Sequence, residues 1–171
     1  MKKAIISLLS VLTGIGAGAG IVGKLAEEEI NKREELANRH LALFLLMNQW
    51  VRVKQEGKQL ASYFEKKKYK NIAIYGMNYV GETLVEELRA TSVHISYAID
   101  KKADYIYVEN IELISLDDDF EPVDAIVVTA ITFFDEIERE LKPKMNCPII
   151  SIKNVLDEVE RGVKNAERAR G

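Results

Sequence analysis

The sequence has one cysteine, three prolines and two histidines among its 171 residues, and little net charge. A lone cysteine, Cys147, cannot form an internal disulfide, which excludes a small secreted scaffold held by cross-links. The formal charge of −3 lacks the basic excess of a nucleic-acid binder, so we expect no nucleic-acid partner. A composition with 47% hydrophobic and 30% charged residues also excludes collagen-like and wholly disordered chains.

An uncharged run from Ala4 to Gly23 stands at the N-terminus. Its residues 4–22 (AIISLLSVLTGIGAGAGIV) would form a helix about 28 Å long, close to the hydrocarbon thickness of a bilayer. We therefore predict a transmembrane anchor over residues 1–23, with the lipid bilayer as the partner of Ala4–Gly23. A cleaved signal peptide and a glycine-rich soluble segment are the alternatives.

Basic residues flank this run unequally. Two lysines precede it, and four basic residues follow it closely: Lys24, Lys32, Arg33 and Arg39. This imbalance favours a cytoplasmic position for the C-terminal side, and a free thiol agrees with that compartment. We expect a single-pass membrane protein whose domain lies in the cytoplasm.

Residues 24–68 are predicted to form a helical stalk and connector. The stalk is rich in charge, with Glu28 and Lys32 at the favourable i,i+4 spacing of a solvated helix. The segment from Leu41 to Val51 instead carries a broad apolar face, which must pack on the domain, a second copy or the membrane surface. A homodimer or another protein partner at this helix is one of these alternatives. Gly57 is placed to end it.

Residues 69–160 alternate strands and helices. Asn71–Tyr75 and Val93–Ile99 read as strands around a helix at Tyr79–Arg89, which is a βαβ unit. Further strands are predicted at Tyr105–Val108, Ile111–Ile114, Val123–Ala130 and Pro148–Ile152, with helices at Phe133–Leu141 and Lys153–Arg161 and a capping pair at Thr132 and Asp135. The predicted fold is α/β, a Rossmann-like parallel sheet with flanking helices, preceded by a long N-terminal helical region that includes the transmembrane helix. Residues 161–171 are predicted to be a polar tail.

The turn after the first strand resembles a dinucleotide-binding fingerprint. Gly76 and Gly81 match the first and third glycines of G-x-G-x-x-G, and Asn78 stands at the middle position. Asparagine tolerates a left-handed backbone, but its side chain fills space that a pyrophosphate needs. Asp100 follows the second strand, where a carboxylate binds ribose hydroxyls and favours NAD over NADP. Alternatively, the glycines serve chain geometry alone and Asp100 caps the next turn.

Ligands of such sheets bind beyond the carboxyl ends of the strands. The predicted cofactor-binding residues are therefore Gly76, Met77, Asn78, Gly81, Asp100, Thr129 and Ala130. NAD is the cofactor that this pattern allows, and any other cofactor is unknown from the sequence. No nucleophile elbow, metal-ligand spacing or acid–base couple stands beside the turn. The catalytic residues, if the protein is an enzyme, are unknown from the sequence, and no metal site is expected.

Residues from about Trp50 to Val159 resemble a group of largely uncharacterised Rossmann-like domains of gut and anaerobic Firmicutes. The resemblance rests on VRVKQEGKQLASYFEKKKYKNIAIYGMNYVGETLVEEL, YAIDKKAD, VDAIVVTAI and CPIIS. Related modules occur beside glycosyltransferases and sugar-modifying enzymes of surface-polysaccharide clusters. The resemblance implies an NAD(P)-binding or nucleotide-sugar-linked domain, and many of its members carry glycine where this chain has Asn78.

Three functions follow from these features. The first is a membrane-anchored Rossmann-like domain that binds a nucleotide or nucleotide-sugar-type ligand as an accessory or sensor module. The second is a degenerate, ligand-free Rossmann domain that acts in protein association. The third is an NAD-linked oxidoreductase or epimerase that a partner protein completes.

Overall fold

The computed structural model describes the backbone of residues 2–101 and 111–168, and the side chains of residues 26–101 and 111–162. The chain divides into two units, Met1–Leu41 and Ala42–Gly171. Helix α1 (Lys2–Gln55) makes up the described part of the first unit and supplies the start of the second. The predicted strand at residues 105–108 lies outside the described residues.

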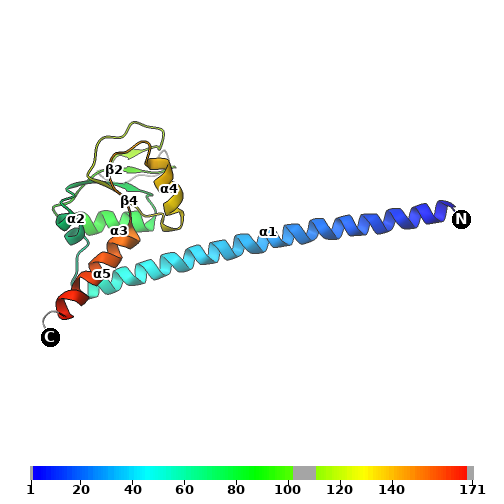
Figure 1. Cartoon of the computed structure of the whole chain (residues 1–171), viewed down its shortest axis with the longest axis horizontal. Coiled ribbons are helices and arrows are strands. Elements are labelled where there is room, and N and C mark those ends of the chain that lie inside the picture. The colour runs from blue at the N-terminus through cyan, green and yellow to red at the C-terminus, as the bar shows by residue number, and fades with distance from the viewer. Residues whose placement is uncertain (1, 102–110, 169–171) are drawn as a thin grey trace. The chain divides into compact units, whose positions relative to one another are not determined.

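The second unit is built on a five-stranded sheet (Figure 1). Its strands lie in the order β3-β2-β1-β4-β5, and every described pairing is parallel. They are β1 (Asn71–Tyr75), β2 (His94–Ile99), β3 (Leu113–Ile114), β4 (Ala125–Val128) and β5 (Ile149–Ser151). The predicted α/β class with a parallel sheet and flanking helices is confirmed, and the order is compatible with a Rossmann-like fold.

Helices cover both faces of the sheet because successive side chains of a strand point to opposite faces. The side chains of Ile72 and Ile74 pack with α2 (Ala61–Lys67), α3 (Tyr79–Leu88), α5 (Ile152–Arg168) and the end of α1. Those of Ala73 and Tyr75 pack with α4 (Phe134–Leu141) on the other face. All four positions are buried, as expected for a central strand of a parallel sheet.

The end of α1 belongs to the core of the second unit. Leu46, Trp50 and Val53 are buried there, so part of the segment that the sequence assigns to a connector is packed domain. The predicted cap at Gly57 is confirmed: its φ is +70°, and its amide donates to the Lys54 carbonyl at 2.9 Å.

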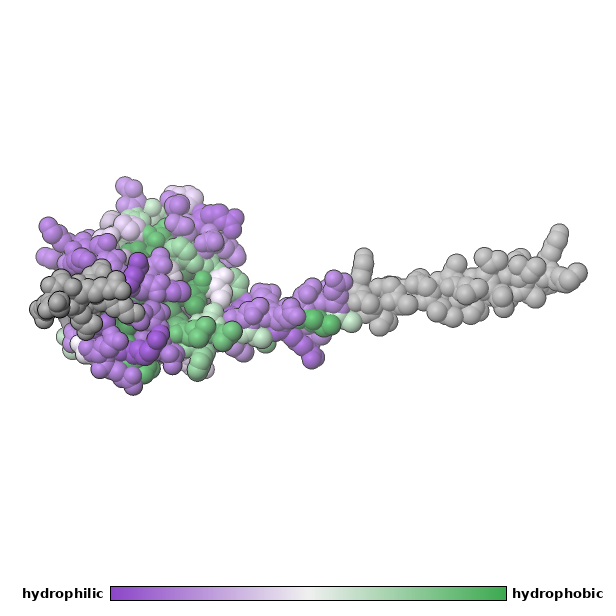
Figure 2. Space-filling model, turned by 60° about the horizontal axis from the view of Figure 1, so that its bottom comes forward, coloured by the Kyte–Doolittle hydropathy of each residue, from purple (hydrophilic) through white to green (hydrophobic). Residues whose placement is uncertain are grey.

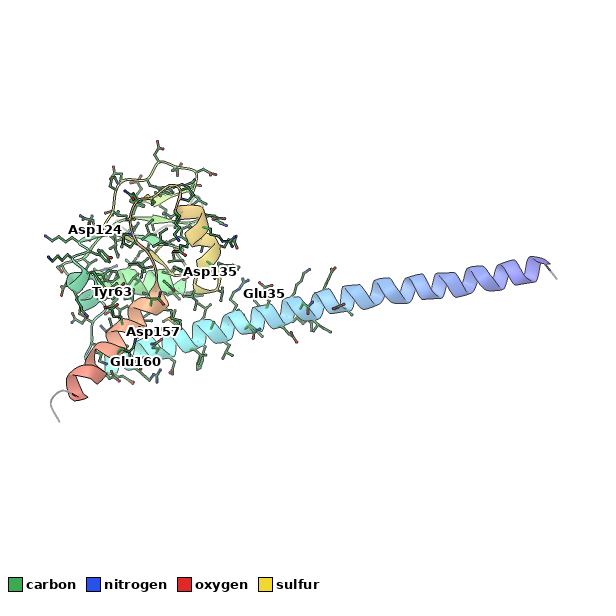
Figure 3. All side chains as sticks on the ribbon, in the orientation of Figure 1. Glu35, Tyr63, Asp124, Asp135, Asp157 and Glu160 are labelled. Atoms are coloured by element: carbon green, nitrogen blue, oxygen red, sulfur yellow. The ribbon has the colours of Figure 1, made fainter. Side chains whose placement is uncertain are left out.

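A hydrogen-bonded contact joins α1 to α5. The Gln49 amide Nε2 donates to carboxylate oxygens of Asp157 and Glu160, both at 2.8 Å. Figure 3 labels these two acidic residues on α5. Gln49 is buried, and these bonds satisfy both N–H groups of its amide. They fix the rotation of α1 about its axis against α5, so its apolar residues face the core.

Two helix ends differ from the sequence predictions. The prediction that Thr132 and Asp135 form a capping pair is wrong. A 3₁₀ turn, Ile131–Phe133, precedes α4, and no described side chain caps either element. α5 continues to Arg168, past Arg161, where the sequence places the polar tail.

The predicted membrane helix, residues 4–22, lies among residues whose side chains the structure does not describe. Among the residues that the structure describes, no helix combines the length and apolar character needed to cross a bilayer.

Asp124 ties the amino ends of β1 and β4 together. Its carboxylate Oδ2 accepts bonds from the Lys70 and Asn71 amides at 2.7 and 2.8 Å, and its own amide donates to the Asn71 carbonyl at 2.7 Å. The two amide donors, that of Asn71 above all, hold the pKa of this carboxyl below its ordinary value of 3.8.

This depressed pKa predicts an acid-sensitive contribution to folding. The contribution is present above pH 3.8 and is lost as the pH falls through the lower, folded-state pKa. We expect Asp124→Asn to lower the urea midpoint at pH 7, because a neutral amide oxygen is a weaker acceptor. We expect the two midpoints to converge below pH 3.8. If the difference between the urea midpoints of the parent and the variant stayed constant from pH 7 to below pH 3.8, the role given to the Asp124 carboxylate would be contradicted.

Candidate functional site

A pocket of about 330 Å³ lies at the carboxyl edge of the sheet. It lies near the boundary between β1 and β4, because the chain continues from β1 to β2 on one side of this boundary and from β4 to β5 on the other. This topological switch point is where open α/β sheets bind ligands. The volume is at the lower end for small-molecule sites. The pocket is lined by residues from the ends of three adjacent strands and from α4: Tyr75, Gly76, Asn78, Asp100, Lys101, Ala130, Phe133, Glu136 and Ile137.

The glycine turn after β1 has no room for a side chain at either of its two glycines. Gly76 has a φ of +95°, and a Cβ there would lie 2.9 Å from Thr129 Oγ1. A Cβ on Gly81 would collide with the Gly76 carbonyl oxygen, so the start of α3 packs directly on the turn. Both glycines therefore meet the geometric demands of the first and third fingerprint positions.

Thr129 holds this turn from β4. It is fully buried, and its hydroxyl lies 3.1 Å from the Tyr75 carbonyl oxygen and 2.5 Å from that of Gly76. The hydroxyl donor is thus used within the fold. Thr129 positions the turn and does not line the pocket.

Asn78 caps α3. Its φ is −94°, so it does not use the left-handed conformation that asparagine permits. Its side-chain Oδ1 accepts from the amides of Val80 and Gly81 at 2.9 and 3.2 Å. These are the donors with which a helix N-terminus holds an anion, and here the chain's own side chain occupies them.

Asp100, at the end of β2, reaches back to the glycine turn. Its Oδ2 accepts from the Met77 amide at 2.8 Å, and the side chain is half-buried at the pocket wall. This bond fixes the carboxylate beside the turn. An ionised carboxylate only accepts hydrogen bonds, so the ligand groups that it suits at this wall are donors such as hydroxyls.

Tyr75 is the last residue of β1 and is 4% exposed. Among the described residues, its hydroxyl has no hydrogen-bond partner. Burial, and then the carboxylates of Glu140, Asp100 and Glu136, raises its pKa to about 12. The group is therefore a neutral O–H donor at physiological pH, and leaving such a donor unsatisfied costs roughly 1–3 kcal/mol.

The described pocket wall is acidic. Asp100 and Glu136 contribute carboxylates, and Lys101 contributes an ammonium group. Lys101 Nζ lies 3.7 Å from Glu140 Oε2 on α4, so an adjacent carboxylate already attracts the basic group of the wall.

The structure brings four of the seven predicted binding residues to the pocket: Gly76, Asn78, Asp100 and Ala130. Met77, Gly81 and Thr129 lie behind the turn, where they support it. Sequence reasoning missed five lining residues: Tyr75, Lys101, Phe133 and the α4 residues Glu136 and Ile137. The position of Tyr75 directly before the fingerprint glycine was the available signal.

The remaining reactive side chains stand apart from this pocket. Cys147 precedes β5 at the amino edge, and burial raises the pKa of its thiol, which lowers its reactivity. His94 is exposed at the amino end of β2. Within the described ranges 26–101 and 111–162, no group of histidine, cysteine, aspartate or glutamate side chains is arranged to hold a metal ion.

The residues at the turn do not fit the pyrophosphate of NAD as the fingerprint would hold it. Asn78 fills the helix N-terminus, and the Asp100 carboxylate occupies the Met77 amide. Comparisons with known proteins add no relative: no family model, curated protein or solved structure matches the chain.

Proposed function

We propose that the second unit binds a nucleotide-type ligand in the switch-point pocket and acts as an accessory or sensor module. The main supporting observation is that three separate loops bring Gly76, Asp100 and Ala130 to one pocket. Tyr75, whose buried hydroxyl has no partner among the described residues, also lines it. A site with convergent polar groups and a shifted pKa is the preferred candidate for ligand binding.

Asp100 supplies the recognition in this proposal. It stands at the end of β2, where a carboxylate accepts hydrogen bonds from ribose hydroxyls, and its bond to Met77 keeps it oriented. A preoriented acceptor loses little conformational freedom on binding. No reaction is assigned, because no nucleophile with an adjacent base lines the described pocket.

Ligand titration tests this function. The full chain in detergent is titrated with adenosine, NAD and UDP-N-acetylglucosamine, and binding is followed by calorimetry and by the shift in Tm. We expect at least one compound to bind, and Asp100→Asn to weaken that binding about tenfold, because the amide loses a charged acceptor.

Asp124→Asn is the matched control, since it makes the same change at the amino edge of the sheet. It should leave ligand affinity unchanged. Absence of heat and of any Tm shift with all three compounds at millimolar concentration would rule out the proposed function.

The N-terminal run supports a membrane anchor as part of the same proposal. Residues 4–22 are uncharged and long enough to cross the bilayer, and basic residues follow them. The domain then lies on the cytoplasmic face. We expect the full chain to remain in the membrane pellet after a high-salt wash, and a chain lacking residues 2–23 to be released. Equal distribution of both forms would contradict the anchor.

Protein association is the second candidate function. On α1 the apolar face from Leu41 to Val51 is only partly used by the core: Phe44, Leu45 and Val51 are 65%, 56% and 51% exposed. Figure 2 shows apolar residues at the surface of the domain among polar ones. Three large apolar side chains on one helix are typical of a contact with a second copy or another protein.

Self-association is predicted to depend on these exposed residues. We expect the double variant Phe44→Asp with Val51→Asp to shift the full chain from dimer to monomer in analytical ultracentrifugation in detergent. Trp50 is unsuitable for this test because it is buried in the core. Tyr79→Asp, at an aromatic residue 84% exposed on α3, is the control and should not change the mass. If the unchanged full chain were monomeric, the proposed homodimer would be contradicted.

A further inference from the structure

We infer that the switch-point pocket selects the nucleoside part of its ligand and disfavours a phosphate at the glycine turn. An uncharged or cationic ribose-bearing compound then binds at least as tightly as its own 5′-phosphate. The inference rests on the proposed function, since it specifies the ligand class of the same pocket.

The first support is that the chain itself satisfies the anion-binding donors. The Val80 and Gly81 amides donate to Asn78 Oδ1, and the Met77 amide donates to Asp100 Oδ2 at 2.8 Å. A phosphate uses free amides at a helix N-terminus. Here it would have to displace the Asn78 side chain and lie against the Asp100 carboxylate.

The second support is the charge of the described wall. Asp100 and Glu136 are acidic, and the ammonium group of Lys101 lies 3.7 Å from a Glu140 carboxylate oxygen. A phosphate dianion would meet like charges, which repel it most strongly where water is excluded. Hydroxyl or ammonium groups of a ligand would instead donate to these carboxylates.

The third support is the Tyr75 hydroxyl. Tyr75 lines the pocket, and its buried hydroxyl lacks a partner among the described residues. A ring nitrogen, carbonyl or hydroxyl oxygen of a nucleoside would satisfy this donor without bringing negative charge. The pocket volume of about 330 Å³ suits one nucleoside better than a dinucleotide.

The experiment compares each nucleoside with its phosphates on the full chain in detergent: adenosine with AMP and NAD, and uridine with UMP and UDP-N-acetylglucosamine. Isothermal titration calorimetry at low salt gives the dissociation constants. We expect the better-binding nucleoside to have a Kd equal to or lower than that of its monophosphate. A monophosphate that binds more tightly than its nucleoside overturns the inference and leaves the proposed function standing. No binding by any compound overturns the proposed function itself.

Two variants test the physical causes separately. Asn78→Gly frees the Val80 and Gly81 amides, so the affinity for the monophosphate should rise about tenfold relative to the affinity for the nucleoside. Asn78→Asp keeps a capping oxygen and is the control for Asn78→Gly. We expect it to give no rise in the affinity for the monophosphate. An unchanged ratio in Asn78→Gly counts against the inference.

Tyr75→Phe removes the donor and keeps the ring. Nucleoside affinity should fall about tenfold, while the Tm without ligand should stay the same or rise, because the lost hydroxyl has no partner among the described residues. Unchanged nucleoside affinity in a folded Tyr75→Phe protein would show that this hydroxyl does not bind the ligand.

Discussion

The absence of space for a side chain where β1, β4 and α3 meet is the constraint on which the rest of the site depends. Gly76 adopts a φ of +95° beside Thr129, and Gly81 packs on the Gly76 carbonyl. The chain can therefore turn sharply from the central strand into α3. This turn presents the Met77 amide to Asp100 and places Asn78 as the cap. The pocket, its carboxylate and its filled helix N-terminus are all consequences of one close backbone approach.

The strands and the glycine turn could be predicted from the sequence because their signals are local. Asn71–Tyr75 has the same bounds in the prediction and in the structure, and the apolar run around Val127 is a buried central strand. Such runs leave few alternatives to a parallel strand covered on both faces. The two glycines likewise have a geometric role that their spacing indicates.

The rest of the site depends on contacts between distant segments. Tyr75 meets α4 only because the strand order places them on one face, and a sequence pattern does not show that a hydroxyl lacks a partner. The role of Asn78 as a cap was also hidden, because an asparagine at the middle glycine position indicates either a left-handed backbone or a cap. Thr132 is a case in which a local pattern misled: the sequence predicts a helix cap there, but the structure has a 3₁₀ turn.

The bond between Gln49 and the α5 carboxylates also has a consequence for how the domain is made. Gln49 and Asp157 are 108 positions apart in the sequence, and α5 follows every strand of the sheet. During synthesis, the apolar side of α1 around Trp50 has no α5 to cover it until the ribosome has passed Glu160. Contacts of such long sequence separation form late and slow the folding of a chain. The nascent chain thus displays an incomplete core through most of its translation.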